Sequence, residues 1–122
     1  MSSERVVQKF VNSAETAVGD ALLGLTLTNS EIGVLEGTHT VVLRKPNPNK
    51  VHLLCGGGSG HEPAHAGYLS EEELSAAVCG GVFASPPTKH IIKAIEHLNH
   101  GSGVLVIIKN YTGDIITFES AV

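Results

Sequence analysis

The residues of this chain that could do chemistry gather around one glycine-rich stretch. Residues 55–67 read Cys-Gly-Gly-Gly-Ser-Gly-His-Glu-Pro-Ala-His-Ala-Gly and follow directly on a short apolar run. Glycines leave backbone amides uncovered and tolerate positive φ, so a small polar ligand could approach there. His61, Glu62 and His65 add two imidazoles and a carboxylate. Because a neutral imidazole can accept a proton near pH 7, His61 is the first candidate base.

Standard nucleotide and hydrolase patterns do not describe the glycine-rich stretch. A GxGxxG pattern from Gly56 meets His61 where its last glycine belongs, and a GxSxG pattern around Ser59 meets the same histidine. The GKS or GKT of a Walker A motif is absent from the sequence. Two structural alternatives stay open: a turn whose glycines serve packing alone, and a His61 that only hydrogen-bonds the loop backbone.

Residues 61–65 match the HExxH pattern of zinc proteases formally. That pattern needs an uninterrupted helix to direct both imidazoles to one metal, whereas Pro63 beside the glycines permits at most a helix start. We therefore expect no metal site and interpret His65 as structural. A metal-dependent hydrolase stays open as a third hypothesis.

Three further polar side chains follow apolar runs elsewhere in the chain. Lys109 and Asp114 bracket the tripeptide Tyr-Thr-Gly after the most strand-like run, and Ser85 follows a short run at residues 82–84. Asp114 could take a proton from a substrate hydroxyl, and Lys109 could hold a ligand oxygen. The structural alternatives are a salt bridge that closes a turn for Lys109 and Asp114, and a helix N-cap for Ser85.

The order of apolar patterns predicts an α/β fold, a layered sheet with at least partly parallel strands and flanking helices. Strands are predicted at residues 40–44, 51–55, 82–84 and 103–109, the last as a central parallel strand. Ligands of such sheets bind outside the carboxyl ends of the strands. We therefore expect the glycine-rich stretch, Ser85 and residues 110–114 to meet at one edge.

Three helices are predicted, with the start of a fourth. An apolar stripe at three- and four-residue spacing predicts the first helix, from about Ser3 to Leu23. Residues 29–38 are expected to form a connection with a short helical turn. A capping box, Ser70 with Glu73, predicts a helix from Glu71 to about Val78. The next helix follows Ser85 with Pro86 at its first position and ends before Gly101, and residues 115–122 could begin another.

Composition excludes several classes of partner. The 122 residues, of which 42% are hydrophobic, are enough for one domain. The eight Lys and Arg residues and the net charge of −4 give no basic stripe, so nucleic acid is not an expected partner. No apolar run approaches the roughly 20 residues that span a bilayer, and the N-terminus lacks a signal-peptide pattern. We expect no membrane association and a cytoplasmic location. Cys55 and Cys79 are predicted to be buried free thiols.

Two motifs and the separation between them carry a resemblance to a known family: GGGSGHEPAHAG from Gly56 and KNYTGD from Lys109, together with Phe-Ala-Ser-Pro at residues 83–86. On these residues the chain resembles the dihydroxyacetone (glycerone) kinase family. The resemblance covers nearly the whole chain and is to the N-terminal part of the substrate-binding, DhaK-type domain. It implies a kinase, a transferase of glycerol metabolism that phosphorylates a hydroxyl of dihydroxyacetone, with glyceraldehyde as a second substrate.

The resemblance also implies site residues. His61 would be the proton acceptor, and Asp114 would activate the hydroxyl that attacks the γ-phosphate. Substrate-binding positions would be Gly57, Gly58, Ser59, Gly60, His61, Ser85, Lys109 and Asp114. Family members carry, far beyond these motifs, a second histidine that forms a hemiaminal with the substrate carbonyl, and residues 1–122 contain no match to it.

The cofactors and partners that the resemblance implies lie outside this chain. ATP and Mg²⁺ would be bound by a helical nucleotide-binding domain, in cis or as a partner subunit, and the donor could instead be phosphoenolpyruvate through an ADP-carrying subunit. The chain, residues 1–122, is then a fragment of the kinase domain, inactive alone and homodimeric when intact. A non-catalytic dihydroxyacetone-sensing module on the same scaffold is the alternative, and it would need no proton acceptor.

Overall fold

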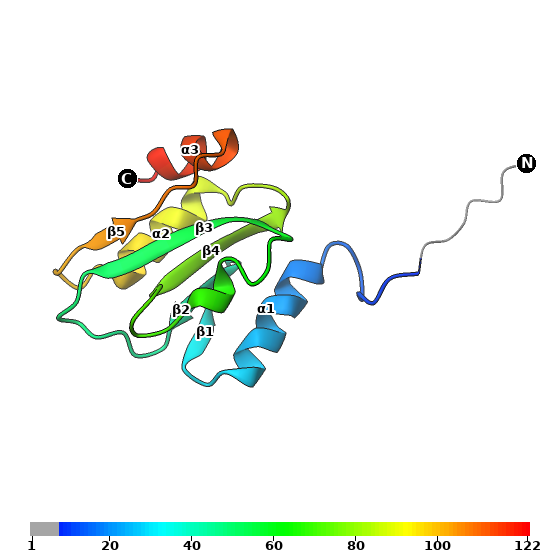
Figure 1. Cartoon of the computed structure of the whole chain (residues 1–122), viewed down its shortest axis with the longest axis horizontal. Helices are drawn as coiled ribbons and strands as arrows, with labels where there is room; N and C mark the ends of the chain where they lie inside the picture. Colours follow the sequence, from blue (N-terminus) through cyan, green and yellow to red (C-terminus); the bar gives the residue numbers. More distant parts are fainter. Residues whose placement is uncertain (1–7) are drawn as a thin grey trace, which may run out of the picture.

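A mixed sheet forms the centre of the protein within residues 8–122, which are the residues that the computed structural model describes (Figure 1). Its strands lie in the order β1, β2, β4, β3, β5, with bounds Ile32–Leu35, Thr40–Leu43, Ala76–Val82, His52–Ser59 and Val104–Val106. The pairs β1–β2 and β2–β4 are antiparallel, whereas β4, β3 and β5 run parallel. The predicted α/β class with partly parallel pairing is confirmed.

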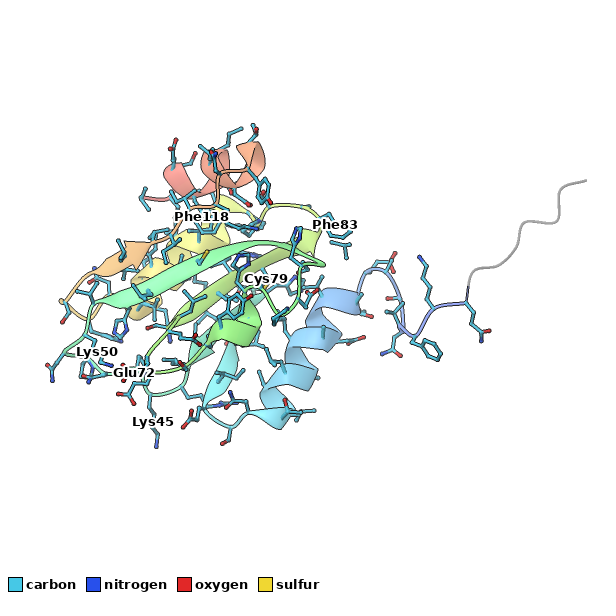
Figure 2. All side chains as sticks on the ribbon, in the orientation of Figure 1. Lys45, Lys50, Glu72, Cys79, Phe83 and Phe118 are labelled. Atoms are coloured by element: carbon cyan, nitrogen blue, oxygen red, sulfur yellow. The ribbon has the colours of Figure 1, made fainter. Side chains whose placement is uncertain are left out.

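Helices cover both faces of the sheet. Helix α1 (Ala17–Thr28) and the 3₁₀ turn η1 (Ala66–Tyr68) pack on one face, and α2 (Thr88–Leu98) with α3 (Thr112–Glu119) on the other (Figure 1). Successive strand residues alternate between the two sides, since Cys55 belongs to the α1 core and Leu54 to the α2 core. Phe118 of α3 is fully buried in the second core, as Figure 2 shows beneath that helix.

The first helix begins later than the apolar stripe predicts. Helix α1 starts at Ala17 rather than near Ser3, and residues 8–16 form bends and turns, with Phe10 fully exposed. The Ser13 hydroxyl accepts the Thr16 amide N–H at 3.1 Å, a local bond that competes with helical pairing. Positions before residue 8 lie outside the described residues. The predicted connection at residues 29–38 is also wrong in part, because it contains β1.

The predicted helix from Glu71 to Val78 is wrong. Residues 71–73 form a turn, in which the Glu73 amide donates to the Ser70 carbonyl at 3.3 Å, and β4 begins at Ala76. Strand β4 pairs with β2 on one side and β3 on the other, and its first five residues are buried. Small residues fit between two helical layers, so sheet pairing overrides the local helix signal.

Two further elements differ from the sequence prediction. Val82 ends β4 instead of opening a new strand, and α2 begins at Thr88 with Pro87 rather than Ser85 as its N-cap. Strand β5 lies at the edge of the described sheet, and Leu105 is 55% exposed. An apolar run can therefore not distinguish a central strand from an edge strand.

Cys55 and Cys79 are free and buried, as predicted. Over residues 8–122, none of the helices has both the length and the apolar character needed to cross a membrane.

Candidate functional site

A pocket of about 290 Å³ lies at the carboxyl ends of the parallel strands. The segments that follow β3, β4 and β5 all contribute to it, which confirms that the three polar stretches converge on one edge. Its lining consists of Gly58, His61, Phe83, Ser85, Lys109, Tyr111 and Asp114.

Asp114 is the most deeply buried charged group of the pocket. It lies in the first turn of α3, where the helix dipole favours a carboxylate, and it is 2% exposed. One carboxylate oxygen accepts the Ser85 hydroxyl at 2.5 Å, and the other lies 3.4 Å from the Lys109 ammonium. The predicted Lys109–Asp114 ion pair is thus present, and the Ser85 hydroxyl holds Asp114 instead of capping α2.

Lys109 reaches the pocket from the segment after β5. Its side chain is one-fifth exposed, and its ammonium lies 5.2 Å from the centre of the Tyr111 ring. The ammonium passes over the α-carbon of Gly57, where a Cβ would collide with it. Gly57, with φ of 153°, therefore supplies the space through which Lys109 reaches Asp114.

The first five residues of the glycine-rich stretch, Cys55 to Ser59, form a strand rather than a loop. Gly56, Gly57, Gly58 and Ser59 belong to β3 and are buried, and a Cβ at Gly56 would overlap the Val78 carbonyl of β4. The packing role that the sequence left open is therefore real at Gly56, whereas the backbone at Gly58 does line the pocket.

Ser59 and Gly60 lie beside the pocket rather than in its lining. The Ser59 hydroxyl donates to the Gly80 carbonyl at 2.8 Å, which joins β3 to β4, and both residues line an apolar groove against α1. Their assignment as ligand-binding positions stays a prediction, as does that of Gly57.

His61 lies on the pocket rim next to Phe83. The two rings meet edge to face, with centroids 5.3 Å apart and planes at 68°. Residues 61–65 form turns, so the helix that an HExxH zinc site needs is not formed there. Across residues 8–122, no group of three or more His, Cys, Asp or Glu side chains is arranged to hold a metal.

Three titratable side chains, those of His65, Cys55 and Cys79, have pKa values shifted toward the neutral form. Burial lowers the pKa of His65, and the positive charge of Lys109 lowers it further. Burial raises the pKa of the Cys79 thiol to about 11, with a smaller contribution from Glu62, and burial raises the pKa of Cys55 as well. The two cysteines are therefore protonated near pH 7 and pack as apolar residues.

Sequence reasoning missed two aromatic residues of the pocket. The sequence predicts Phe83 within a brief buried strand and assigns no role to Tyr111, which lies in the tripeptide between Lys109 and Asp114, yet both line the pocket. A signal existed for both, because each lies within five residues of a candidate site residue in a chain with only five Phe and Tyr residues. Their side chains are more than half exposed, which places them on the rim.

Comparison with known proteins identifies the family. The Dak1 domain matches residues 23–122. The chain belongs to the Dak1 domain family. Its resemblance to dihydroxyacetone kinases is thereby confirmed, and the fold agrees: a dihydroxyacetone kinase from C. freundii in complex with AMP-PNP and Mg²⁺ superposes with a TM-score of 0.88 at 41% identity, over 93% of this chain and 22% of that one.

Two curated relatives of this Dak1 domain represent different functions. The dihydroxyacetone-binding subunit DhaK of a PTS-dependent dihydroxyacetone kinase from Listeria innocua is 45% identical over 116 residues, which cover 94% of this chain and 35% of the subunit. The DhaKLM operon coactivator DhaQ from Lactococcus lactis is 42% identical over 114 residues, or 93% of this chain and 35% of that protein. The chain thus spans about a third of the length of these relatives.

Proposed function

We propose that this Dak1 domain is the acceptor-binding part of a dihydroxyacetone kinase, which transfers a phosphoryl group to a hydroxyl of dihydroxyacetone. The observation that carries the proposal is the pocket in which a buried carboxylate, an ammonium and an imidazole face one small space. Its volume, about 290 Å³, is at the small end of ligand sites and suits a molecule with three carbons. The 45% identity to a dihydroxyacetone-binding subunit supports this choice of ligand.

Each polar group of the pocket has a role in this proposal. The Lys109 ammonium donates to a ligand oxygen, and Asp114 takes the proton of the hydroxyl that attacks the γ-phosphate. His61 accepts a proton or hydrogen bond from the ligand at the rim. The Ser85 hydroxyl, which donates to Asp114 at 2.5 Å, fixes the orientation of that carboxylate.

The phosphoryl donor belongs to a part of the enzyme beyond these residues. The related C. freundii kinase was solved with AMP-PNP and Mg²⁺, and this chain matches 22% of it, so ATP and Mg²⁺ are the proposed cofactors of the complete enzyme. We propose that a helical nucleotide-binding domain, in cis or as a partner subunit, presents the donor to the pocket. Homodimer formation, the inactivity of residues 1–122 alone and a cytoplasmic location stay predictions.

The assay for this proposal is phosphorylation of dihydroxyacetone by the complete protein. ATP with Mg²⁺ and a phosphoenolpyruvate-dependent partner subunit are tested as alternative donors, with glyceraldehyde as a second acceptor. Wild type should form the phosphorylated product, and His61→Ala and Asp114→Ala should each lose activity by at least about a hundredfold. Undiminished rates in both variants would contradict the assigned roles.

A sensing module is the second candidate, because a coactivator is 42% identical to this chain. Such a protein binds dihydroxyacetone without phosphorylating it. Titration calorimetry on the same preparation distinguishes the two: tight binding without turnover under either donor supports the sensor, and turnover supports the kinase.

A further inference from the structure

Phe83 has an unusual backbone for an aromatic residue. Its φ is 51°, in the left-handed region, and it is the sole residue other than glycine with positive φ among residues 8–122. That region is unfavourable for bulky side chains and persists where the surroundings enforce it. Here the Phe83 amide donates to the Ser59 carbonyl at 2.7 Å, so the end of β3 fixes the turn after β4.

The strained backbone does not serve to bury the ring. The Phe83 side chain is 70% exposed, at the end of the sheet where Figure 2 labels it. The ring instead lies over Gly60, where an added Cβ would come within 2.6 Å of it, and meets the His61 imidazole edge to face at 5.3 Å. Gly60, with φ of 107°, provides the space for this contact.

The His61 imidazole has few other restraints. Its residue is exposed, and within the described part of the chain its ring nitrogens make no hydrogen bond, whereas the buried Asp114 has two polar partners. The edge-to-face contact with the Phe83 ring is thus the side-chain interaction that the described part of the chain shows for this imidazole.

We propose that Phe83 is a positioning residue whose ring holds the His61 imidazole toward the pocket. The strained turn serves this purpose: the hydrogen bond to Ser59 places the ring, and the ring places the imidazole. The kinetic consequence rests on the proposed kinase function, because it requires His61 to accept a proton or hydrogen bond from the acceptor substrate. The contact itself does not depend on that function.

The test uses Phe83→Gly and Phe83→Tyr in the complete protein. Glycine suits the positive φ, so Phe83→Gly removes the ring without adding strain, and Phe83→Asn serves as a second variant that tolerates this conformation. Phe83→Tyr keeps the ring. Phe10→Gly, which removes an aromatic side chain that is fully exposed and outside the pocket lining, is the matched control.

Two measurements are made on each variant: the NMR three-bond couplings of isotope-labelled His61, which report its χ1 rotamer independently of the ring current of Phe83, and the steady-state kinetics with dihydroxyacetone. We expect the couplings to indicate one His61 rotamer in wild type and an average over several rotamers in Phe83→Gly and Phe83→Asn. In these two variants kcat should fall by on the order of tenfold to a hundredfold, with KM changed by less than about threefold. Phe83→Tyr and Phe10→Gly should both behave as wild type.

Unchanged His61 couplings in Phe83→Gly would overturn the inference, as would a rise in KM at constant kcat, which would mean that the ring binds substrate directly. A lower melting temperature with unchanged couplings and normal kcat would show a merely structural role. If the wild-type protein does not phosphorylate dihydroxyacetone, the proposed function fails, and the His61 couplings alone then decide the positioning inference.

Discussion

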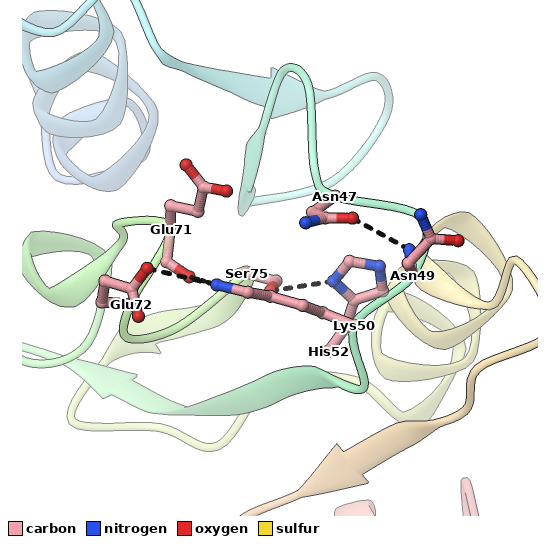
Figure 3. A network of polar contacts seen from close by, with 7 residues as sticks. All are labelled: Asn47, Asn49, Lys50, His52, Glu71, Glu72 and Ser75. Carbon is pink, nitrogen blue, oxygen red and sulfur yellow. Dashed lines mark hydrogen bonds and ion pairs between the residues drawn. The ribbon is translucent and has the colours of Figure 1, made fainter.

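The two ends of the parallel strands carry polar networks of similar size but different construction. At the carboxyl end, Asp114 is buried with Ser85 and Lys109 around an open pocket. At the opposite end, Lys50 donates to the Glu71 carbonyl and lies 3.2 Å from Glu72, as Figure 3 shows. Figure 2 places Phe83 at one end of the sheet and Lys50 with Glu72 at the other.

The two networks differ in how deeply their charged side chains are buried. The side chains of Lys50 and Glu72 are 41% and 85% exposed, so water screens their attraction, whereas that of Asp114 is 3% exposed. The buried group of the Lys50 end is neutral: His52 is 3% exposed and shares a hydrogen bond of 3.1 Å with the Ser75 hydroxyl (Figure 3). Among residues 8–122, the one buried residue with a charged side chain is thus Asp114, which lies beside the pocket, where a ligand would use its charge. This difference is why we assign function to one end and structure to the other.

The sharpest test of this comparison replaces one buried titratable group at each end. Asp114→Asn should lower kcat with dihydroxyacetone by about a thousandfold, because the amide cannot take the hydroxyl proton. His52→Asn should keep kcat within about threefold, since His52 lies at the other end of the strands. The rates are measured by a coupled assay on the complete protein.

Glu119→Gln, an exposed change in the helix that carries Asp114, is the matched control and should behave as wild type. Equal losses in Asp114→Asn and His52→Asn would remove the functional distinction between the two ends.

A glycine pair tests whether the space at Gly57 serves the pocket. Gly57→Ala should displace the Lys109 ammonium and weaken dihydroxyacetone binding by about tenfold, the loss expected for one hydrogen bond to a charged group. Calorimetric titration measures the affinity. The control is Gly24→Ala in α1, where an added Cβ would extend into open space, and it should stabilise the fold by about 0.5–1 kcal/mol. Full affinity in Gly57→Ala would show that Lys109 does not contact the ligand.

His52, the buried histidine at the opposite end of the strands, should make the stability of the protein depend on pH. Burial lowers the pKa of His52 below its ordinary value of 6.5, and nearby His100 lowers it further. The unfolded chain therefore binds the proton more tightly, so the free energy of unfolding should fall as the pH decreases below 6.5. Urea unfolding between about pH 8 and about pH 5 measures this slope.

His52→Asn should flatten the slope, because the asparagine amide can still donate to Ser75 but does not titrate. Part of the slope should remain, since burial also lowers the pKa of His65 and His90. An unchanged slope in His52→Asn would show that His52 is not protonated preferentially in the unfolded chain.

The smallest expected effect belongs to the exposed ion pair. A double-mutant cycle with Lys50→Ala and Glu72→Ala should give a coupling free energy below about 1 kcal/mol, decreasing with added salt. The cycle is measured by urea unfolding. A coupling above about 2 kcal/mol, independent of salt, would show that this network is as structurally important as the buried pair at the pocket.

The sequence determined the class of the fold and most of the site. The change from three- and four-residue spacing to short β-branched runs indicates α/β layers, and polar residues after apolar runs indicate a common edge, because parallel strands end together. The motifs around His61 and Lys109 indicated the family. These signals are local, so they can be read along the chain without knowledge of its contacts.

Only the tertiary structure decided which local signals prevailed. The capping box at Ser70 predicts a helix, yet pairing with β2 and β3 makes the following residues a strand. The glycines after Cys55 suggest a loop, yet they let β3 lie against β4 and let Lys109 pass over Gly57 to Asp114. The strained turn at Phe83 cannot be predicted from the sequence, since its φ depends on the hydrogen bond that the Phe83 amide donates to the Ser59 carbonyl of β3. Such contacts join residues far apart in the chain, which is why spacing alone does not predict them.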